Sequence, residues 1–462
     1  MDKEKIQYEK MTKTPPKKLV IQLGIPTVIS MLITAIYNIA DTYFVTGLNP
    51  AASGAVNVAF PLMAVIQAIG FTFGMGSSSL ISAKLGEKKG DEAQTVGSSA
   101  FYVSIILGIV IAVVSSIFIE PLMLLLGSTD EVLPYAINYS RYVIIGFPFM
   151  IGSFVLNNIL RGEGKSKLAM IGLTTGGILN VILDPIFIYN LNLGIAGAAI
   201  ATAISQSISF IILLMMFILK KSIIKLSINK ITKDLKVYLE VFRVGFPSFC
   251  RQALAAIAVT LLNNQAKIYG GTNGLSAIGI VSKIFTVIFT IGLGIGQGYQ
   301  PVCGYNYAAG KYSRVKEAMF FTFICGTSIM TLLCIFCFFF AKEVINFFPN
   351  VSDQALEIGQ QALRYQCIAL PFLSLNVIIN MTFQSIRKKT LASLLSCCRQ
   401  GIFFIPLVLT LPKALGLQGV ELIQSISDFL TFVISVPFFI WFVNDLNKKI
   451  KIEKENEKAY NV

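Results

Sequence analysis

The sequence predicts an all-α integral membrane protein with twelve transmembrane helices in two pseudo-symmetric six-helix bundles. Three observations lead to this fold class: the composition, the placement of the basic residues and an internal repeat. Of 462 residues, 55% are hydrophobic and only 13% are charged. Because a soluble protein carries roughly a quarter charged residues, this composition excludes a soluble enzyme, a secreted disulfide scaffold and a disordered chain.

Hydropathy along the chain predicts twelve segments that are long enough to cross a bilayer, which takes about 20 apolar residues. The predicted spans are 19–45, 52–80, 93–118, 132–160, 167–190, 194–219, 238–268, 275–302, 314–340, 353–384, 390–411 and 416–443. The polar, lysine-rich start of the chain lacks the pattern of a cleavable signal peptide. We therefore expect a tail that leads into a retained first helix.

The basic residues indicate how these spans are oriented. On an alternating path with both ends inside, the inner segments hold 30 of the 38 Lys and Arg residues, and the outer loops hold 3. Cytoplasmic loops attract Lys and Arg. We therefore expect a multi-pass protein of the plasma (inner) membrane with both termini cytoplasmic. The net charge of +14 then reflects topology, with no nucleic-acid partner.

The two halves of the chain repeat each other. Gly24-Ile25-Pro26 matches Gly245-Phe246-Pro247 at an offset of 245 − 24 = 221, and the glycines of 70–76 match those of 292–298. Since each half has an even number of spans, this is a parallel repeat, an arrangement typical of transporters. The predicted parts are a tail at 1–18, a bundle at 19–219, a linker at 220–237, a bundle at 238–443 and a tail at 444–462.

The N-terminal half carries two carboxylates well inside predicted spans, Asp41 and Asp184. Asn180 lies one turn before Asp184 on the same helix face, and Thr202 returns to a similar depth on the next span. Pro185 has no N–H, so a carbonyl one turn earlier is released. Ionisable groups inside a bilayer are costly and usually functional. We therefore predict an oxygen-rich cation site at these positions.

Such a site has two chemical interpretations. Two nearby carboxylates in apolar surroundings should share a proton, because desolvation and like charge both disfavour two ionised groups. Alternatively, the oxygen ligands suit a hard cation such as sodium at Asp41, Asn180, Asp184 and Thr202. The competing structural interpretation is that one aspartate caps a broken helix, or that the two carboxylates face different cavities.

Other residues carry weaker signals. In the C-terminal half we predict a buried structural charge network, because a carboxylate among cations needs partners. Pro26 is either a hinge or a tolerated kink. The eight cysteines show no metal-ligand spacing and are expected to be reduced and packed. No nucleophile–base pair and no cofactor motif is apparent, so we expect no enzyme. The predicted network is Arg251, Lys283, Arg399 and Asp428, and the candidate lining of a substrate path is Tyr37, Asn38, Tyr139 and Asn157.

Six short motifs follow one another along the chain in a characteristic order. They are Gly24-Ile25-Pro26, Ala40 to Val45, Phe60-Pro61-Leu62, Arg161 to Gly164, Asn180-x-x-x-Asp184-Pro185 and Gly416-Leu417-Gln418-Gly419. Together with the repeat they resemble the multidrug and toxic compound extrusion (MATE) family, in particular its DinF-type and MepA-like branches. The NorM-type branch carries acidic residues in helices 7 and 10, where this chain has Ala255 and Phe372.

The resemblance implies a V-shaped pair of bundles that exports amphipathic, mostly cationic drugs in exchange for protons or sodium. It implies that Asp41, Asn180, Asp184 and Thr202 form the cation site, with Tyr139 and Asn157 near it or along the substrate path. Our interpretation is therefore a monomeric multidrug antiporter whose partners are small amphipathic drugs, a monovalent cation and the lipid bilayer. The alternatives are a lipid-linked precursor flippase of the same superfamily and, from another class, a channel or membrane scaffold.

Overall fold

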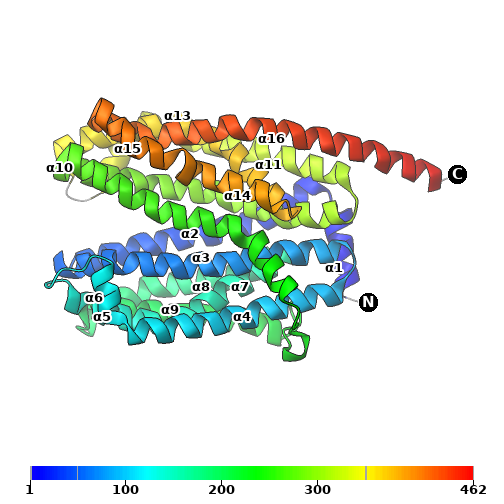
Figure 1. Cartoon of the computed structure of the whole chain (residues 1–462), viewed down its shortest axis with the longest axis horizontal. Helices are drawn as coiled ribbons and strands as arrows, with labels where there is room; N and C mark the ends of the chain where they lie inside the picture. The colour runs from blue at the N-terminus through cyan, green and yellow to red at the C-terminus, as the bar shows by residue number, and fades with distance from the viewer. Residues whose placement is uncertain (1–2, 49, 349–350, 461–462) are drawn as a thin grey trace. The chain divides into compact units, whose positions relative to one another are not determined.

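The computed structural model describes residues 3–48, 50–348 and 351–460, and the ordered elements of these residues are all helices (Figure 1). Ten described helices are long and apolar enough to span a membrane, and α6 with α7 adds one span that bends by 48°. The helix α10 (Leu235–Ala308) consists of two helices joined at Gly271, whose φ is 58°. With α10 counted twice, 10 + 1 + 1 gives twelve spans, which confirms the predicted fold class.

The first six spans correspond closely to the predicted positions. They are α2 (Pro16–Thr46), α3 (Pro50–Gly86), α4 (Gly90–Ile117), α6 (Leu133–Ile145) with α7 (Phe147–Gly162), α8 (Ser166–Pro185) with the π-helix η1 (Ile186–Asn190), and α9 (Gly194–Ile218). The bend between α6 and α7 falls at Gly146, just before Pro148 in the first turn of α7. Proline is tolerated there because that N–H has no helical partner.

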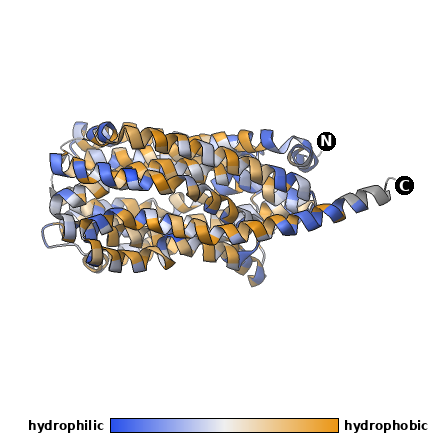
Figure 2. Cartoon of the chain, turned by 90° about the horizontal axis from the view of Figure 1, so that it is seen from above, coloured by the Kyte–Doolittle hydropathy of each residue, from blue (hydrophilic) through white to orange (hydrophobic). Residues whose placement is uncertain are grey.

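The second set begins in α10 and continues to the end of the chain. Its further spans are α11 (Tyr312–Phe339), α13 (Asp353–Ser385), α14 (Lys389–Cys397) with the π-helix η3 (Cys398–Ile402) and α15 (Phe404–Leu415), and α16 (Leu417–Tyr460). Shorter helices are α1 (Lys3–Lys13), α5 (Ile119–Leu125), η2 (Ile228–Lys230) and α12 (Ala341–Asn346). Apolar residues dominate the spans, and hydrophilic residues gather at the end of α16 (Figure 2).

The chain divides into two compact units. Unit 1 consists of Met1–Glu9 and Ile29–Gln252, and unit 2 consists of Lys10–Val28 and Ala253–Val462. The units therefore differ from the predicted bundles 19–219 and 238–443 at two places. The first part of α2 belongs to unit 2, and the first part of α10 belongs to unit 1.

Glycines explain why the start of α10 packs in unit 1. A Cβ atom on Gly245 would lie 1.9 Å from the carbonyl oxygen of Thr72 in α3. A Cβ on Gly76 would lie 2.1 Å from the carbonyl oxygen of Val241. Since real Cβ atoms never come this close, only glycine allows the two backbones to approach. Small residues serve the same purpose in other membrane helix pairs.

The repeat produces the corresponding contact in unit 2. A Cβ on Gly298 of α10 would lie 2.3 Å from the Cα of Gly24 in α2, and one on Gly294 would lie 2.8 Å from the Cα of Val28. The repeated glycine motifs therefore serve close helix packing. In each unit these glycines allow a helix to pack against the first part of a helix that belongs to the other repeat: the start of α10 in unit 1 and the start of α2 in unit 2.

We predict that Gly298→Ala destabilises the protein and that Gly24→Ala does not. The new methyl group at position 298 overlaps the α2 backbone, whereas a Cβ on Gly24 meets nothing within 4 Å. Overpacking of this kind costs about 1–3 kcal/mol. Thermal unfolding of both variants in detergent tests this, and equal melting temperatures would contradict it.

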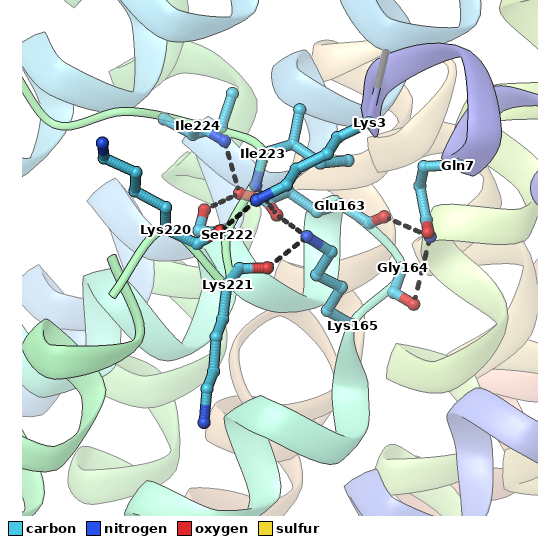
Figure 3. Close-up of polar contacts among 10 residues, drawn as sticks. All are labelled: Lys3, Gln7, Glu163, Gly164, Lys165, Lys220, Lys221, Ser222, Ile223 and Ile224. Carbon is cyan, nitrogen blue, oxygen red and sulfur yellow. Dashed lines mark hydrogen bonds and ion pairs between the residues drawn. The ribbon is translucent and has the colours of Figure 1, made fainter. Parts of the chain in front are cut away.

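A buried carboxylate in unit 1 holds the segment that follows α9 (Figure 3). Glu163 accepts hydrogen bonds from the Ser222 hydroxyl and from the backbone N–H groups of Ile223 (2.8 Å) and Ile224 (3.1 Å). It also forms an ion pair with Lys165 at 3.6 Å. Burial raises the pKa of the Glu163 carboxyl, and Lys165 opposes this shift. The linker is thus fixed to unit 1 by specific contacts.

The N-terminal helix α1 contacts the same region in Figure 3. The Gln7 side chain donates to the carbonyl oxygens of Glu163 (2.8 Å) and Gly164 (3.4 Å). Lys3 Nζ donates to the carbonyl oxygen of Lys220 at 2.7 Å. Residues 3–13 of the predicted tail 1–18 therefore form a helix, and its first residues have their own contacts in unit 1.

We expect Glu163→Ala to accelerate amide hydrogen exchange at Ile223 and Ile224 by about tenfold or more. A hydrogen bond to a charged group contributes about 1.5–3 kcal/mol, and this change removes two of them from backbone donors. Asp91→Asn is the matched control, because Asp91 pairs with Lys230 at 3.1 Å but is 87% exposed. Exchange that is unchanged in Glu163→Ala would show that other contacts hold the linker.

The eight cysteines are all free in the structure, and six of them are buried. Among the described residues no group of three or more His, Cys, Asp or Glu side chains is arranged to hold a metal ion. Packed thiols are therefore what the structure shows, in agreement with the sequence.

Candidate functional site

The centre of the candidate site is a hydrogen-bonded group on α8 and α9. Asn180 Nδ2 donates to Asp184 Oδ1 at 3.1 Å and to Thr202 Oγ1 at 3.2 Å. All three side chains are buried. Helical spacing of four residues places Asn180 beneath Asp184, and Pro185 then ends the regular α8 before η1 begins. The structure therefore brings together three of the four predicted cation-site residues.

Asp41 reaches this group because α2 runs beside α8 and η1. Tyr189 Oη donates to the carbonyl oxygen of Phe44 at 2.7 Å, three residues beyond Asp41. A Cβ on Gly177 would lie 3.2 Å from the Tyr37 ring, four residues before Asp41. Asp41 and Asp184 are close enough to interact electrostatically. The two carboxylates thus share one region of unit 1.

Three oxygen atoms in this region are buried without a hydrogen-bond partner among the described residues: Asp41 Oδ1, Asn180 Oδ1 and Asp184 Oδ2. Buried polar atoms in native structures are nearly always satisfied. Unused oxygen lone pairs next to two carboxylates are what a proton or a hard cation requires. These oxygen atoms therefore fit either a proton or a hard cation such as sodium.

Two tyrosines border the carboxylates. Tyr139 is fully buried, its hydroxyl lies 3.8 Å from Met63 Sδ, and it interacts electrostatically with both aspartates. Tyr37 Oη accepts a hydrogen bond of 3.4 Å from Gln206 Nε2. The structure thus places these two candidate path residues beside the cation-site residues. Their role in a substrate path stays a prediction.

Asn38 and Asn157 differ from the tyrosines. Asn38 is exposed. Asn157 is buried, and its Nδ2 donates to the carbonyl oxygen of Ala169 at 2.8 Å, which joins α7 to α8. In unit 2 Asn380 makes the same contact with Ala392, at 2.7 Å and the same separation of 12 residues. This repetition indicates that Asn157 is a packing residue.

We predict that Asn157→Ala and Asn380→Ala each lower the free energy of unfolding by about 0.5–1.5 kcal/mol, because each removes a buried hydrogen bond between neighbouring helices. Asn138→Ala is the control, since Asn138 is exposed on α6. Chemical unfolding in detergent measures all three. A stable Asn157→Ala protein with altered drug binding would instead support the predicted role of Asn157 in the substrate path.

The predicted charge network in the C-terminal half is smaller than expected. Arg399 Nε forms a buried ion pair with Asp428 Oδ1 at 2.8 Å. Lys283 is exposed and forms no ion pair among the described residues. Arg251 belongs to unit 1, where its Nη2 donates to Ser248 Oγ at 3.3 Å. The prediction grouped four charged residues of predicted spans, but a position inside a span does not determine which face of the helix a side chain occupies.

Several polar residues near these sites were not among the predicted site residues. In unit 2, Gln424 donates to Asp428 Oδ1 at 2.9 Å, and Gln400 donates to Gln424 at 3.4 Å. Glu421 is buried in α16. The signal that could have identified Glu421 is the same as for Asp428: it is a carboxylate inside a predicted span.

Comparisons with known proteins agree with this architecture. A family model described as MatE matches residues 26–186 and, separately, 247–410. "Multidrug export protein MepA" of Staphylococcus saprophyticus is 27% identical over 427 residues, covering 91% of this chain and 92% of that protein. The protein of the same name from Staphylococcus aureus is 26% identical over 422 residues, with the same coverage.

A solved structure described as the outward-facing conformation of a multidrug resistance MATE family transporter of the MOP superfamily is also similar. Its TM-score is 0.90 at 27% identity, covering 96% of this chain and 98% of that one. The fold, the repeat and these matches define a multi-pass membrane transporter. The chain belongs to the MatE family, which matches both halves.

Proposed function

We propose that this protein is a multidrug efflux antiporter that exports amphipathic, mostly cationic compounds in exchange for protons or sodium. The observation that carries the proposal is the buried group in unit 1. There, Asp41, Asn180 and Asp184 present buried oxygen atoms that have no hydrogen-bond partner among the described residues. The drug-export names of the curated relatives support the choice of substrate and do not favour a lipid-linked flippase.

In the proposed cycle, an external cation binds the carboxylates of unit 1 and neutralises them. Loss of that charge removes the cost of burying two like charges and allows α2 to repack, which releases the drug outward. The membrane potential contributes about 2.3 kcal/mol per charge per 100 mV. One proton or sodium ion per cycle therefore suffices for a useful drug gradient.

Pro26 is the proposed hinge for the movement of α2. It lies inside the helix, where it cannot donate to the carbonyl oxygen of Gln22. It also lies two residues before Val28, where the part of α2 in unit 2 ends. A weakened helix at this boundary lets the segment with Asp41 move while residues 10–28 keep their packing in unit 2.

The proposed setting follows from the excess of basic residues in the inner loops. The protein lies in the plasma (inner) membrane with both termini in the cytoplasm. It acts as a monomer, because one chain contains both six-helix halves of the repeat.

The test is efflux of a fluorescent cationic dye from liposomes that contain the purified protein, under separately imposed proton and sodium gradients. We expect one gradient to drive efflux. We expect Asp41→Asn and Asp184→Asn each to reduce it to the level of protein-free liposomes, because an amide takes up no proton and carries no negative charge for a cation to neutralise.

Asp130→Asn provides the matched control, since Asp130 is an exposed aspartate of the same unit. It should transport like the unaltered protein. Dye efflux that persists in both Asp41→Asn and Asp184→Asn would disprove the site. Absence of flux under both gradients in the unaltered protein would disprove antiport of the dye.

A further inference from the structure

A second polar group lies inside unit 2, far along the chain from the cation site. The ion pair of Arg399 and Asp428 joins η3 to α16 and is buried on both sides. Ser427 Oγ donates to the carbonyl oxygen of Arg399 at 2.5 Å and strengthens the same contact. Arg399 lies in a π-helical turn, a distortion that is frequent at functional sites.

The ion pair uses only half of its hydrogen-bonding capacity. Asp428 Oδ1 accepts from both Arg399 Nε (2.8 Å) and Gln424 Nε2 (2.9 Å). Asp428 Oδ2 and Arg399 Nη2 are buried, and neither has a partner among the described residues. Arginine and carboxylate normally form two parallel hydrogen bonds. Here the second bond is not made, although both of its atoms are present beside the first.

Two further buried atoms in this region have no described partner, Gln400 Oε1 and Ser425 Oγ. Ser425 lies three residues before Asp428 on α16 and thus on the same helix face. Gln400 donates to Gln424, which in turn donates to Asp428. The region therefore offers one cationic donor, Arg399 Nη2, together with three oxygen acceptors. All four side chains are more than nine-tenths buried.

Aromatic rings fix the position of the donor. The Arg399 guanidinium lies over the Phe289 ring at 4.3 Å and over the Phe285 ring at 5.0 Å, both from α10. Such stacking holds the guanidinium plane in place. With the guanidinium held over these rings, its Nη2 has no partner among the described residues, and neither has Asp428 Oδ2.

We propose that Arg399, Asp428, Gln400 and Ser425 form a binding site for an ammonium–carboxylate zwitterion, the head group of an amino-acid-like exported compound. The carboxylate of the ligand accepts from Arg399 Nη2. Its ammonium group donates to Asp428 Oδ2, Gln400 Oε1 and Ser425 Oγ. Because the ion pair and the zwitterion are each neutral, binding buries no uncompensated charge. The proposal rests on the export function above and adds a substrate class to it.

The test uses two fluorescent probes that differ by one carboxylate, ε-dansyl-lysine and dansylcadaverine. Dansyl fluorescence reports their binding to the full-length protein in nanodiscs. We expect the double variant Arg399→Met with Asp428→Leu to weaken ε-dansyl-lysine binding by at least about tenfold more than it weakens dansylcadaverine binding, because only ε-dansyl-lysine has the carboxylate that Arg399 binds. Replacing both partners by apolar residues leaves no unpaired charge, so folding should be retained.

Asp428→Asn is a second variant, and it keeps the size of the side chain. It removes the acceptor charge for the ammonium group, so we expect preference to shift from ε-dansyl-lysine toward its Nα-acetyl derivative, which keeps only the carboxylate. Ser435→Ala on the same helix is the control, because Ser435 contacts Asn376 and lies outside the proposed site. It should bind both probes like the unaltered protein.

Two results would overturn the proposal. The first is equal binding of ε-dansyl-lysine by the unaltered protein and the double variant, together with no shift in Asp428→Asn. The second is failure of the unaltered protein to bind ε-dansyl-lysine, which would mean that only water joins the free atoms. Gradient-driven efflux of dansylcadaverine, lost in Asp41→Asn, tests the export function separately.

Discussion

Where the start of α10 crosses α3, the backbones approach so closely that a Cβ at Gly245 would lie 1.9 Å from the Thr72 carbonyl oxygen. Gly298 and Gly24 make the corresponding approach in unit 2. In a bilayer, apolar side chains gain little from contact with one another, so close backbone packing is the main means of joining helices. These two crossings hold the start of α10 in unit 1 and the start of α2 in unit 2. The rest of α2, with Asp41, belongs to unit 1.

The sequence predicted the architecture well because its signals are strong and local. Apolar runs, basic loops and matched glycine motifs indicated twelve spans and a parallel repeat. They did not indicate that residues 10–28 pack with unit 2 or that 235–252 pack with unit 1. Hydropathy reports that a segment crosses the membrane, but not which other helix it touches. The glycines showed that close contacts exist, but their partners are known only from the fold.

The two polar sites show the same limit at the level of side chains. Asn180 and Asp184 share a helix, so their spacing predicted their contact, and Asp41 and Thr202 followed from depth. For Lys283, depth alone was misleading, because the side chain is exposed. The π-helical turn at 398–402 changes the faces on which Arg399 and Gln400 lie. Helical periodicity computed from sequence cannot include such a turn.

Each half of the chain supplies the first part of one helix to the compact unit that the other half mainly forms. A chain cut within the linker at 220–234 would leave each piece without one segment of its own compact unit, since residues 10–28 belong to unit 2 and residues 235–252 belong to unit 1. Neither half is therefore a complete folding unit. A protein of half this length would need two copies that exchange their first half-helices, whereas here a single polypeptide contains both exchanged segments.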